Sequence, residues 1–328
     1  MNMADGGGDD IFVYLGGDHQ EVPDEITHAV IDPSVKTVRG ESFWNRRRLV
    51  SVIFHDGVEI IEEQAFSNCI SLSGRMNLLG VRDIGDKAFD DCVALSDVYF
   101  GDRLETIGFR AFNYCMSLRS IKVPSVRTVL EWAFCNCEQL TDVEFGIDLE
   151  TIAVNSFYSC QRLQRIAIPL KDNIFPLDPE ERQYNQFQEC RNLTTVDIVG
   201  ADGIHNTISS LLLESWKDDM SEEINRINQE LRGTNHFEKT RSIRLWVRSV
   251  IDRLEHYKAE HNRLLKEHMT QLELAVWKTR LDERDDSFTL KVQTKRAKID
   301  EESSREEKRI TSGADIIIKN ILPFLKLA

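Results

Sequence analysis

The sequence lacks any long apolar run. No stretch of its 328 residues approaches the roughly 18 consecutive apolar residues of a membrane-spanning helix. The first residues, MNMADGGGDDIFVYLGG, also lack the basic segment and apolar core of a secretory signal. We therefore expect an intracellular protein, cytoplasmic or nuclear, with no membrane-spanning segment.

Motifs of catalysis and phosphate binding are also missing. The chain has no G-x-S-x-G nucleophile motif, no glycine-rich phosphate loop and no HExxH zinc motif. His256, His261 and His268 lie five and seven residues apart, whereas two ligands on one helix face need a spacing of about four. A metal site there is the weaker alternative to ordinary hydrogen-bonded histidines. We predict a non-enzymatic protein with no catalytic residue, cofactor or metal ion.

Positive charge is scarce in the first part of the chain. Residues 1–204 carry 18 Lys and Arg against 33 Asp and Glu, whereas residues 205–328 carry 23 against 22. This shift predicts an N-terminal segment (1–23), a repeat domain with a half-repeat cap (24–204) and a C-terminal region (205–328). The acidic part would repel phosphate backbones, so we expect a protein partner, basic or neutral, and no nucleic acid.

Cysteine is infrequent, with seven residues, yet six of them stand at one place in a repeat. The copies read AFSNCISL, AFDDCVAL, AFNYCMSL, AFCNCEQL, SFYSCQRL and QFQECRNL. Their phenylalanines, preceded by Phe43 in SFWNRRRL, are spaced by 23, 23, 23, 22, 23 and 30 residues: Phe43, Phe66, Phe89, Phe112, Phe134, Phe157 and Phe187. A fixed period in this range predicts a solenoid in which one repeat makes one coil.

Each coil divides into two parts. After the Cys, apolar residues alternate, as in Leu118, Ile121 and Val123, which predicts a strand with one buried face. Such strands from successive coils would stack into a parallel sheet. The other part has spacings of three and four, as in Leu104, Ile107 and Ala111, and we expect a helical or 3₁₀ turn there.

These residues resemble a known family, the BspA-like subtype of leucine-rich repeat. The pattern is clearest in IGFRAFNYCMSLRSIKV, and the resemblance covers about residues 24–199. It implies an α/β repeat fold, a curved solenoid of about seven to eight coils of 22–23 residues, used for protein or surface recognition. Arg75 and Asn77 depart from the pattern because they fall where apolar residues should face the core, so a register slip or bulge is expected near Gly74 to Leu78.

The repeated cysteines are expected to form a buried column of free thiols. Stacked coils place equivalent Cα atoms about 4.8 Å apart, within bridging range, but their Cβ vectors run parallel rather than converging. The count of seven is odd, and Cys135 lies off the column. Free thiols agree with a reducing compartment.

Helical spacing replaces the repeat after Asn206. An apolar stripe predicts a first helix ended by Gly233, a long amphipathic helix follows at about 240–284, and a last helix is expected at about 313–326. The strings RSIRLWVRSVIDRLEHYKAEHNRLLKEHMTQLELAVWKTRLDE and GADIIIKNILPFLKL resemble C-terminal segments of uncharacterised diatom and algal repeat proteins. The near-heptad stripe from Trp246 to Trp277 offers a coiled-coil alternative function, a scaffold that forms a homo-oligomer through residues 205–328.

The positions between the core residues of each strand point outward on the concave side. We predict that a protein partner binds this surface, against the alternative of an ordinary solvated face. The candidate residues combine an apolar and aromatic strip with charged neighbours: Ile53, Met76, Asp97, Tyr99, Lys122, Asp142, Glu144, Arg165 and Asp197.

Overall fold

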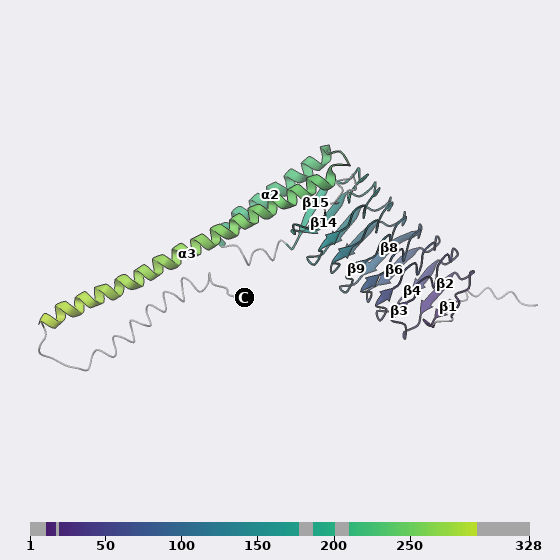
Figure 1. Ribbon diagram of the computed structural model, residues 1–328, viewed down its shortest axis with the longest axis horizontal. Coiled ribbons are helices and arrows are strands. Elements are labelled where there is room, and N and C mark those ends of the chain that lie inside the picture. Colours follow the sequence, from purple (N-terminus) through teal and green to yellow (C-terminus); the bar gives the residue numbers. More distant parts are fainter. Residues whose placement is uncertain (1–10, 18–19, 177–185, 201–209, 294–328) are drawn as a thin grey trace, which may run out of the picture. The chain divides into compact units, whose positions relative to one another are not determined.

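One side of the solenoid consists of parallel strands. The structure is a computed structural model that describes residues 11–17, 20–176, 186–200 and 210–293. The strands of this side are β1 (Ile11–Tyr14), β2 (His28–Ile31), β4 (Ser51–Ile53), β6 (Gly74–Leu78), β8 (Leu95–Phe100), β10 (Ser120–Val123), β12 (Asp142–Phe145), β14 (Arg165–Pro169) and β15 (Thr195–Val199). They form the parallel ladders β1-β2-β4, β6-β8 and β10-β12-β14-β15, which follow one another along the solenoid (Figure 1). The predicted stacked sheet is confirmed.

The sheet begins earlier than the repeat pattern indicates. Strand β1 lies within residues 1–23, where the sequence predicted no strand, and pairs in parallel with β2 from Ile11↔His28 to Tyr14↔Ile31. Tyr14 is buried. Its ring packs against Phe43 with centroids 5.2 Å apart, so β1 covers the aromatic core of the first coil.

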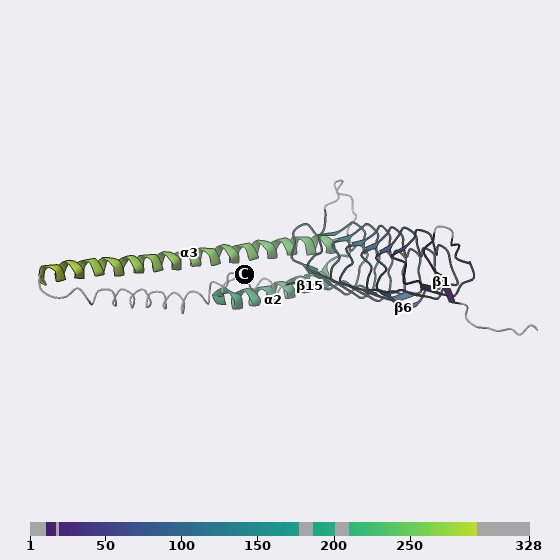
Figure 2. The same cartoon turned by 90° about the horizontal axis from the view of Figure 1, so that it is seen from below.

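The opposite side of each coil is a two-residue strand followed by turns. Hydrogen bonds from residue i+3 to residue i close these turns, as from Ala111 N to Gly108 O, so the predicted turn is present as separate turns that do not continue as a helix. The short strands are β3 (Thr37–Val38), β5 (Ile60–Ile61), β7 (Asp83–Ile84), β9 (Thr106–Ile107), β11 (Thr128–Val129) and β13 (Thr151–Ile152), and they pair in parallel. Figure 2 shows the stacked coils from the side. From Phe43 to Phe157, the residues two positions before and two positions after each repeated Phe have φ of 53–63°, as at Arg110 and Tyr114. Residues in the left-handed region interrupt a right-handed helix, so the chain turns instead.

The repeated phenylalanines stack along the solenoid interior. Neighbouring rings from Phe43 to Phe187 have centroids 4.8–5.7 Å apart and interplanar angles of 2–23°. All of them are fully buried. Phe100 adds an edge contact to Phe112 from β8, so both sides of the coil converge on this column.

The cysteines form the buried column of free thiols that the sequence predicted. All seven are free and buried. Each repeated Sγ donates to the backbone carbonyl of the Phe one coil earlier at 3.0–3.3 Å, as Cys92 does to Phe66. A thiol at this place is therefore small enough for the core and links consecutive coils by a hydrogen bond.

We expect these thiols to be unreactive in the folded protein. Burial raises the pKa of Cys69 and Cys135 to about 12 and also raises the pKa of the other five. Because the thiolate is the reactive form, labelling with a thiol reagent at pH 8 should modify none of the seven cysteines before unfolding and all seven in denaturant. Modification of the native protein at the rate of free cysteine would contradict the buried column.

Two helices close the C-terminal end of the solenoid. Helix α2 (Ser210–Gly233) ends at the predicted glycine, and α3 (Lys239–Gln293) follows. The side chain of Asn228 accepts a hydrogen bond from Val196 N at 2.8 Å, and Thr240 Oγ1 accepts one from Phe187 N at 3.1 Å. In earlier coils the equivalent backbone N–H groups donate to carbonyls of the next coil. The helices thus take the place of a further coil.

Lys239 completes this closure. Its Nζ donates to the carbonyls of Arg191 at 2.8 Å and Leu193 at 2.6 Å, and the residue is 2% exposed. Burial lowers the pKa of this amine. Two carbonyls at the end of the last coil are therefore satisfied by one buried amine.

Helix α3 is longer than predicted. It runs on to Gln293 instead of residue 284 because no Gly or Pro interrupts residues 284–293. Residues 215–254 belong to the same compact unit as the solenoid, and the remainder of α3 belongs to a second unit. The last helix predicted at 313–326 lies outside the described residues. No helix in the described ranges is long and apolar enough to cross a membrane.

Candidate functional site

The outward side chains of the broad strands form straight rows, which we call the strand face. The backbone register places Ser120, Asp142, Arg165 and Thr195 in one row and Lys122, Glu144, Ala167 and Asp197 in the next. Strand β8 contributes Asp97 and Tyr99, and β4 contributes Ile53. Eight of the nine candidate residues predicted from the sequence lie on this face.

Met76 is the exception, and its predicted outward position is wrong. Its side chain is 3% exposed and pairs in register with the core residue Val98. The register shifts between Gly74, which has φ of 77°, and Arg75. After this shift Met76 faces inward, and Arg75 and Asn77 lie on the strand face. The predicted slip near Gly74 to Leu78 is confirmed.

Apolar and aromatic groups occupy the first part of the strand face. Ile53 is 60% exposed and Tyr99 is 43% exposed. The guanidinium of Arg75 lies over the Tyr99 ring, 4.8 Å from its centroid. An arginine stacked on an exposed tyrosine holds both side chains in place. The sequence could have assigned Arg75 to this pair only with the register known.

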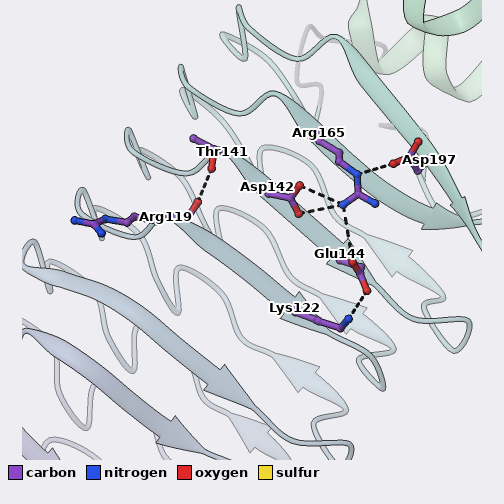
Figure 3. A network of polar contacts seen from close by, with 7 residues as sticks. All are labelled: Arg119, Lys122, Thr141, Asp142, Glu144, Arg165 and Asp197. Atoms are coloured by element: carbon purple, nitrogen blue, oxygen red, sulfur yellow. Dashed lines mark hydrogen bonds and ion pairs between the residues drawn. The ribbon is translucent and has the colours of Figure 1, made fainter. Parts of the chain in front are cut away.

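Charged groups occupy the second part and form one network (Figure 3). Arg165 on β14 donates from Nε to Asp197 on β15 at 2.5 Å and from Nη1 to both carboxylate oxygens of Asp142 on β12 at 3.1 and 3.2 Å. Its Nη1 also lies 3.9 Å from Glu144, which pairs with Lys122 on β10 at 2.7 Å. Burial lowers the pKa of Arg165, but the bonds to Asp197 and Asp142 outweigh this and raise it.

The network is nearly balanced in charge. Three carboxylates face two cations, and each of these side chains is partly exposed. Exposed pairs of this kind contribute at most about 1 kcal/mol each to stability. Their clear effect is on geometry, because Arg165 fixes the positions of carboxylates on two neighbouring strands.

The described residues contain neither a metal-ligating cluster nor an exposed cysteine. Among the described residues, no cluster of three or more His, Cys, Asp and Glu could hold a metal ion. Burial raises the pKa of every cysteine, which leaves no activated thiolate.

Comparison with known proteins identifies the repeat. The family model described as BspA type leucine rich repeat region matches residues 23–78 and 82–201 in six copies. No curated protein matches. Similar solved structures include a leucine-rich repeat protein from Eubacterium ventriosum, with 23% identity over 44% of this chain and 40% of that chain, at a TM-score of 0.40.

Two further bacterial structures show similarity. The leucine-rich repeat protein TpLRR of T. pallidum is 24% identical over 52% of this chain and 68% of that chain, at a TM-score of 0.37. The pneumococcal vaccine antigen PcpA is 17% identical over 57% of this chain and 66% of that chain, at a TM-score of 0.31. The resemblance of the helical region to diatom and algal proteins stays a prediction.

Proposed function

Because this chain belongs to the BspA-type leucine-rich repeat family, we propose that it is a non-enzymatic module that binds a protein partner on its strand face. In the curved solenoid that the family implies, this face is the concave side. The proposed contact residues are Ile53, Asp97, Tyr99, Lys122, Asp142, Glu144, Arg165 and Asp197, with Arg75 and Asn77 in place of Met76.

The pre-ordered stack of Arg75 on Tyr99 carries this proposal. Tyr and Arg are enriched among residues that dominate binding energy at interfaces. Both side chains stand on paired strands and constrain each other, so a partner loses little conformational entropy in ordering them. An exposed Ile53 on the same face adds apolar area.

The chemistry of the face suggests the kind of partner. Residues 1–204 carry an excess of 15 negative charges, which favours encounter with a basic protein. The Arg165 network is almost neutral, so its contribution is directional hydrogen bonding. We therefore propose a partner with a basic surface around an apolar or aromatic contact.

Replacement of Tyr99 tests this function. We expect Tyr99→Ala to weaken partner capture at least tenfold, equivalent to about 1.4 kcal/mol, because it removes both the ring and the support of Arg75. Tagged chain would be incubated with extract of the organism that encodes it, and bound proteins would be quantified by mass spectrometry.

Tyr114→Ala is the matched control, because Tyr114 is 39% exposed but lies in the turns between strands. Both variants should keep the circular dichroism spectrum of the wild type. Equal loss of the same bound protein in both variants, or no loss with Tyr99→Ala, would remove the strand face from consideration.

We also propose a reducing compartment, cytoplasmic or nuclear. Its support is that all seven cysteines are free and buried, six of them in one column, since most proteins of oxidising compartments pair their cysteines.

Self-association through α3 is a second candidate function. The first part of the apolar stripe of α3 already packs within the chain, because Trp246 is buried and its indole donates to Glu223 O of α2 at 3.1 Å. Farther along α3, Leu274 and Trp277 are 64% and 63% exposed. A dimer of the full chain that becomes a monomer on removal of the residues after Tyr257 would favour this scaffold.

A further inference from the structure

A second surface stands out at the first strand of the sheet. Strand β1 pairs only with β2, and within the described ranges no strand pairs with its other edge. Ile11 and Val13 of β1, and Leu15 directly after it, are 58%, 47% and 59% exposed. A flat apolar edge strand is a template for pairing with another chain unless it is protected.

One side chain already occupies part of that edge. Tyr14 O accepts a hydrogen bond from Asp32 N on the β2 side, and alternate residues of a strand direct their backbone groups to opposite edges. On the other edge, Leu15 N donates to Gln20 Oε1 at 2.6 Å and Gln20 Nε2 donates to Val13 O at 2.7 Å. The amide of Gln20 makes the two bonds that a neighbouring strand would make.

The apolar side chains of β1 continue into the neighbouring strands. Val13 is in register with Val30, and Val30 with Ile53, which is 60% exposed. An occupant of the β1 edge would therefore meet an apolar surface on one side as well as backbone groups at the edge.

From these contacts we propose that the free edge of β1 is a homodimer interface, in which the β1 strands of two copies pair antiparallel about a two-fold axis at Val13. Gln20 is the internal competitor that this pairing displaces. The inference concerns the backbone edge of β1, at one end of the strand face, and does not depend on the proposed partner; Ile53 adjoins both surfaces.

Self-complementarity points to a second copy as the occupant. Antiparallel pairing centred on Val13 sets Val13 opposite Val13 of the second copy and Ile11 opposite Leu15, so apolar side chains meet at every outward position. Two-fold symmetry requires such self-matching. The stretch IFVYLGG also carries no charge, whereas residues 1–204 carry an excess of 15 negative charges that would repel a second copy elsewhere.

Disulfide trapping tests the pairing directly. In the proposed geometry two Val13 Cα atoms face each other in a hydrogen-bonded pair, about 5.5 Å apart, within bridging range. Val13→Cys in the full chain should give a covalent dimer on mild oxidation, and the seven buried cysteines provide a silent background. Ile53→Cys is the control, since Ile53 is at least as exposed as Val13 but its two copies in the dimer would lie about 24 Å apart, five strand spacings.

Sedimentation over a range of concentrations provides the second readout. We expect Val13→Asp to weaken self-association at least tenfold, because it opposes two like charges on the axis, and Gln20→Ala to strengthen it by removing the competitor. Val13→Asp should keep the wild-type circular dichroism spectrum, since the side chain faces outward.

The proposal is overturned by any of three results. These are equal trapping of Val13→Cys and Ile53→Cys, no trapped dimer of Val13→Cys, or the same mass for wild type and Val13→Asp at every concentration. If wild type and Val13→Asp were both dimers at every concentration, self-association would be assigned to another surface, such as α3.

Discussion

A chain that ends at residue 204 is expected to lose its soluble, cooperative fold, whereas one that ends at Tyr257 is expected to keep it. The shorter chain lacks Asn228, Lys239 and Thr240, which bond to backbone groups of the last coil. It also uncovers the apolar end of the solenoid, and open ends of repeat proteins need a cover. Soluble yield and thermal unfolding followed by circular dichroism provide the measurement.

A point variant separates the contribution of the hydrogen bonds to stability from that of the apolar area that the helices cover. Lys239→Met keeps the length of the side chain but leaves the carbonyls of Arg191 and Leu193 without their donor. Buried groups left unpaired cost about 1–3 kcal/mol each. A chain ending at residue 204 that unfolds at the same temperature as the chain ending at Tyr257 would show that the helices are not a cap.

Phe112→Ala is expected to destabilise the protein by about 3–5 kcal/mol, the usual cost of removing a large buried aromatic side chain. The ring stacks between Phe89 and Phe134 at centroid distances of 5.1 and 5.3 Å and meets the edge of Phe100 at 5.9 Å. The variant therefore interrupts the column at its centre and leaves a cavity. The urea midpoint of unfolding provides the measurement.

Phe109→Ala is the matched control because Phe109 is only partly buried, three residues earlier in the same coil. Phe109→Ala should lower the free energy of unfolding much less, since the Phe109 ring is already in contact with solvent. If the two variants shifted the midpoint equally, the stacked column would not be the principal core of the solenoid.

The repeat could be predicted from the sequence because each coil places the same residue types at the same points. A Phe that stacks on its own copies, and a Cys that bonds to the carbonyl of the previous Phe, are needed once per coil. The shifted strand was also foreseeable, since Arg75 and Asn77 would otherwise lie in the core. That Met76 turns inward in their place follows only from the register shift between Gly74 and Arg75.

The turns could not be predicted from apolar spacing. Spacings of three and four suit a helical turn and a string of tight turns equally, and only the backbone shows φ of 55° at Arg110 and 57° at Tyr114. Strand β1 was missed because it is four residues long and carries no copy of the repeat. The short run IFVYL, rich in aromatic and β-branched residues, was the available signal.

The candidate site was predictable in its residues but not in its interactions. Alternation along each strand places Asp142, Glu144 and Arg165 outward, and the structure agrees. The alternation alone does not show that Arg165 bridges Asp142 and Asp197, because that inference requires the register of three strands. Likewise, the stripe of α3 indicates that one face is buried without showing that the last coil is what it covers.

Photocrosslinking from position 99 tests the proposed function most directly. A photoreactive phenylalanine analogue would replace Tyr99 on the strand face or, as the control, Tyr114 among the turns, and tagged chain would be irradiated in extract. We predict one discrete protein adduct from position 99 that position 114 does not give. An adduct from position 114 with none from position 99 would contradict recognition by the strand face.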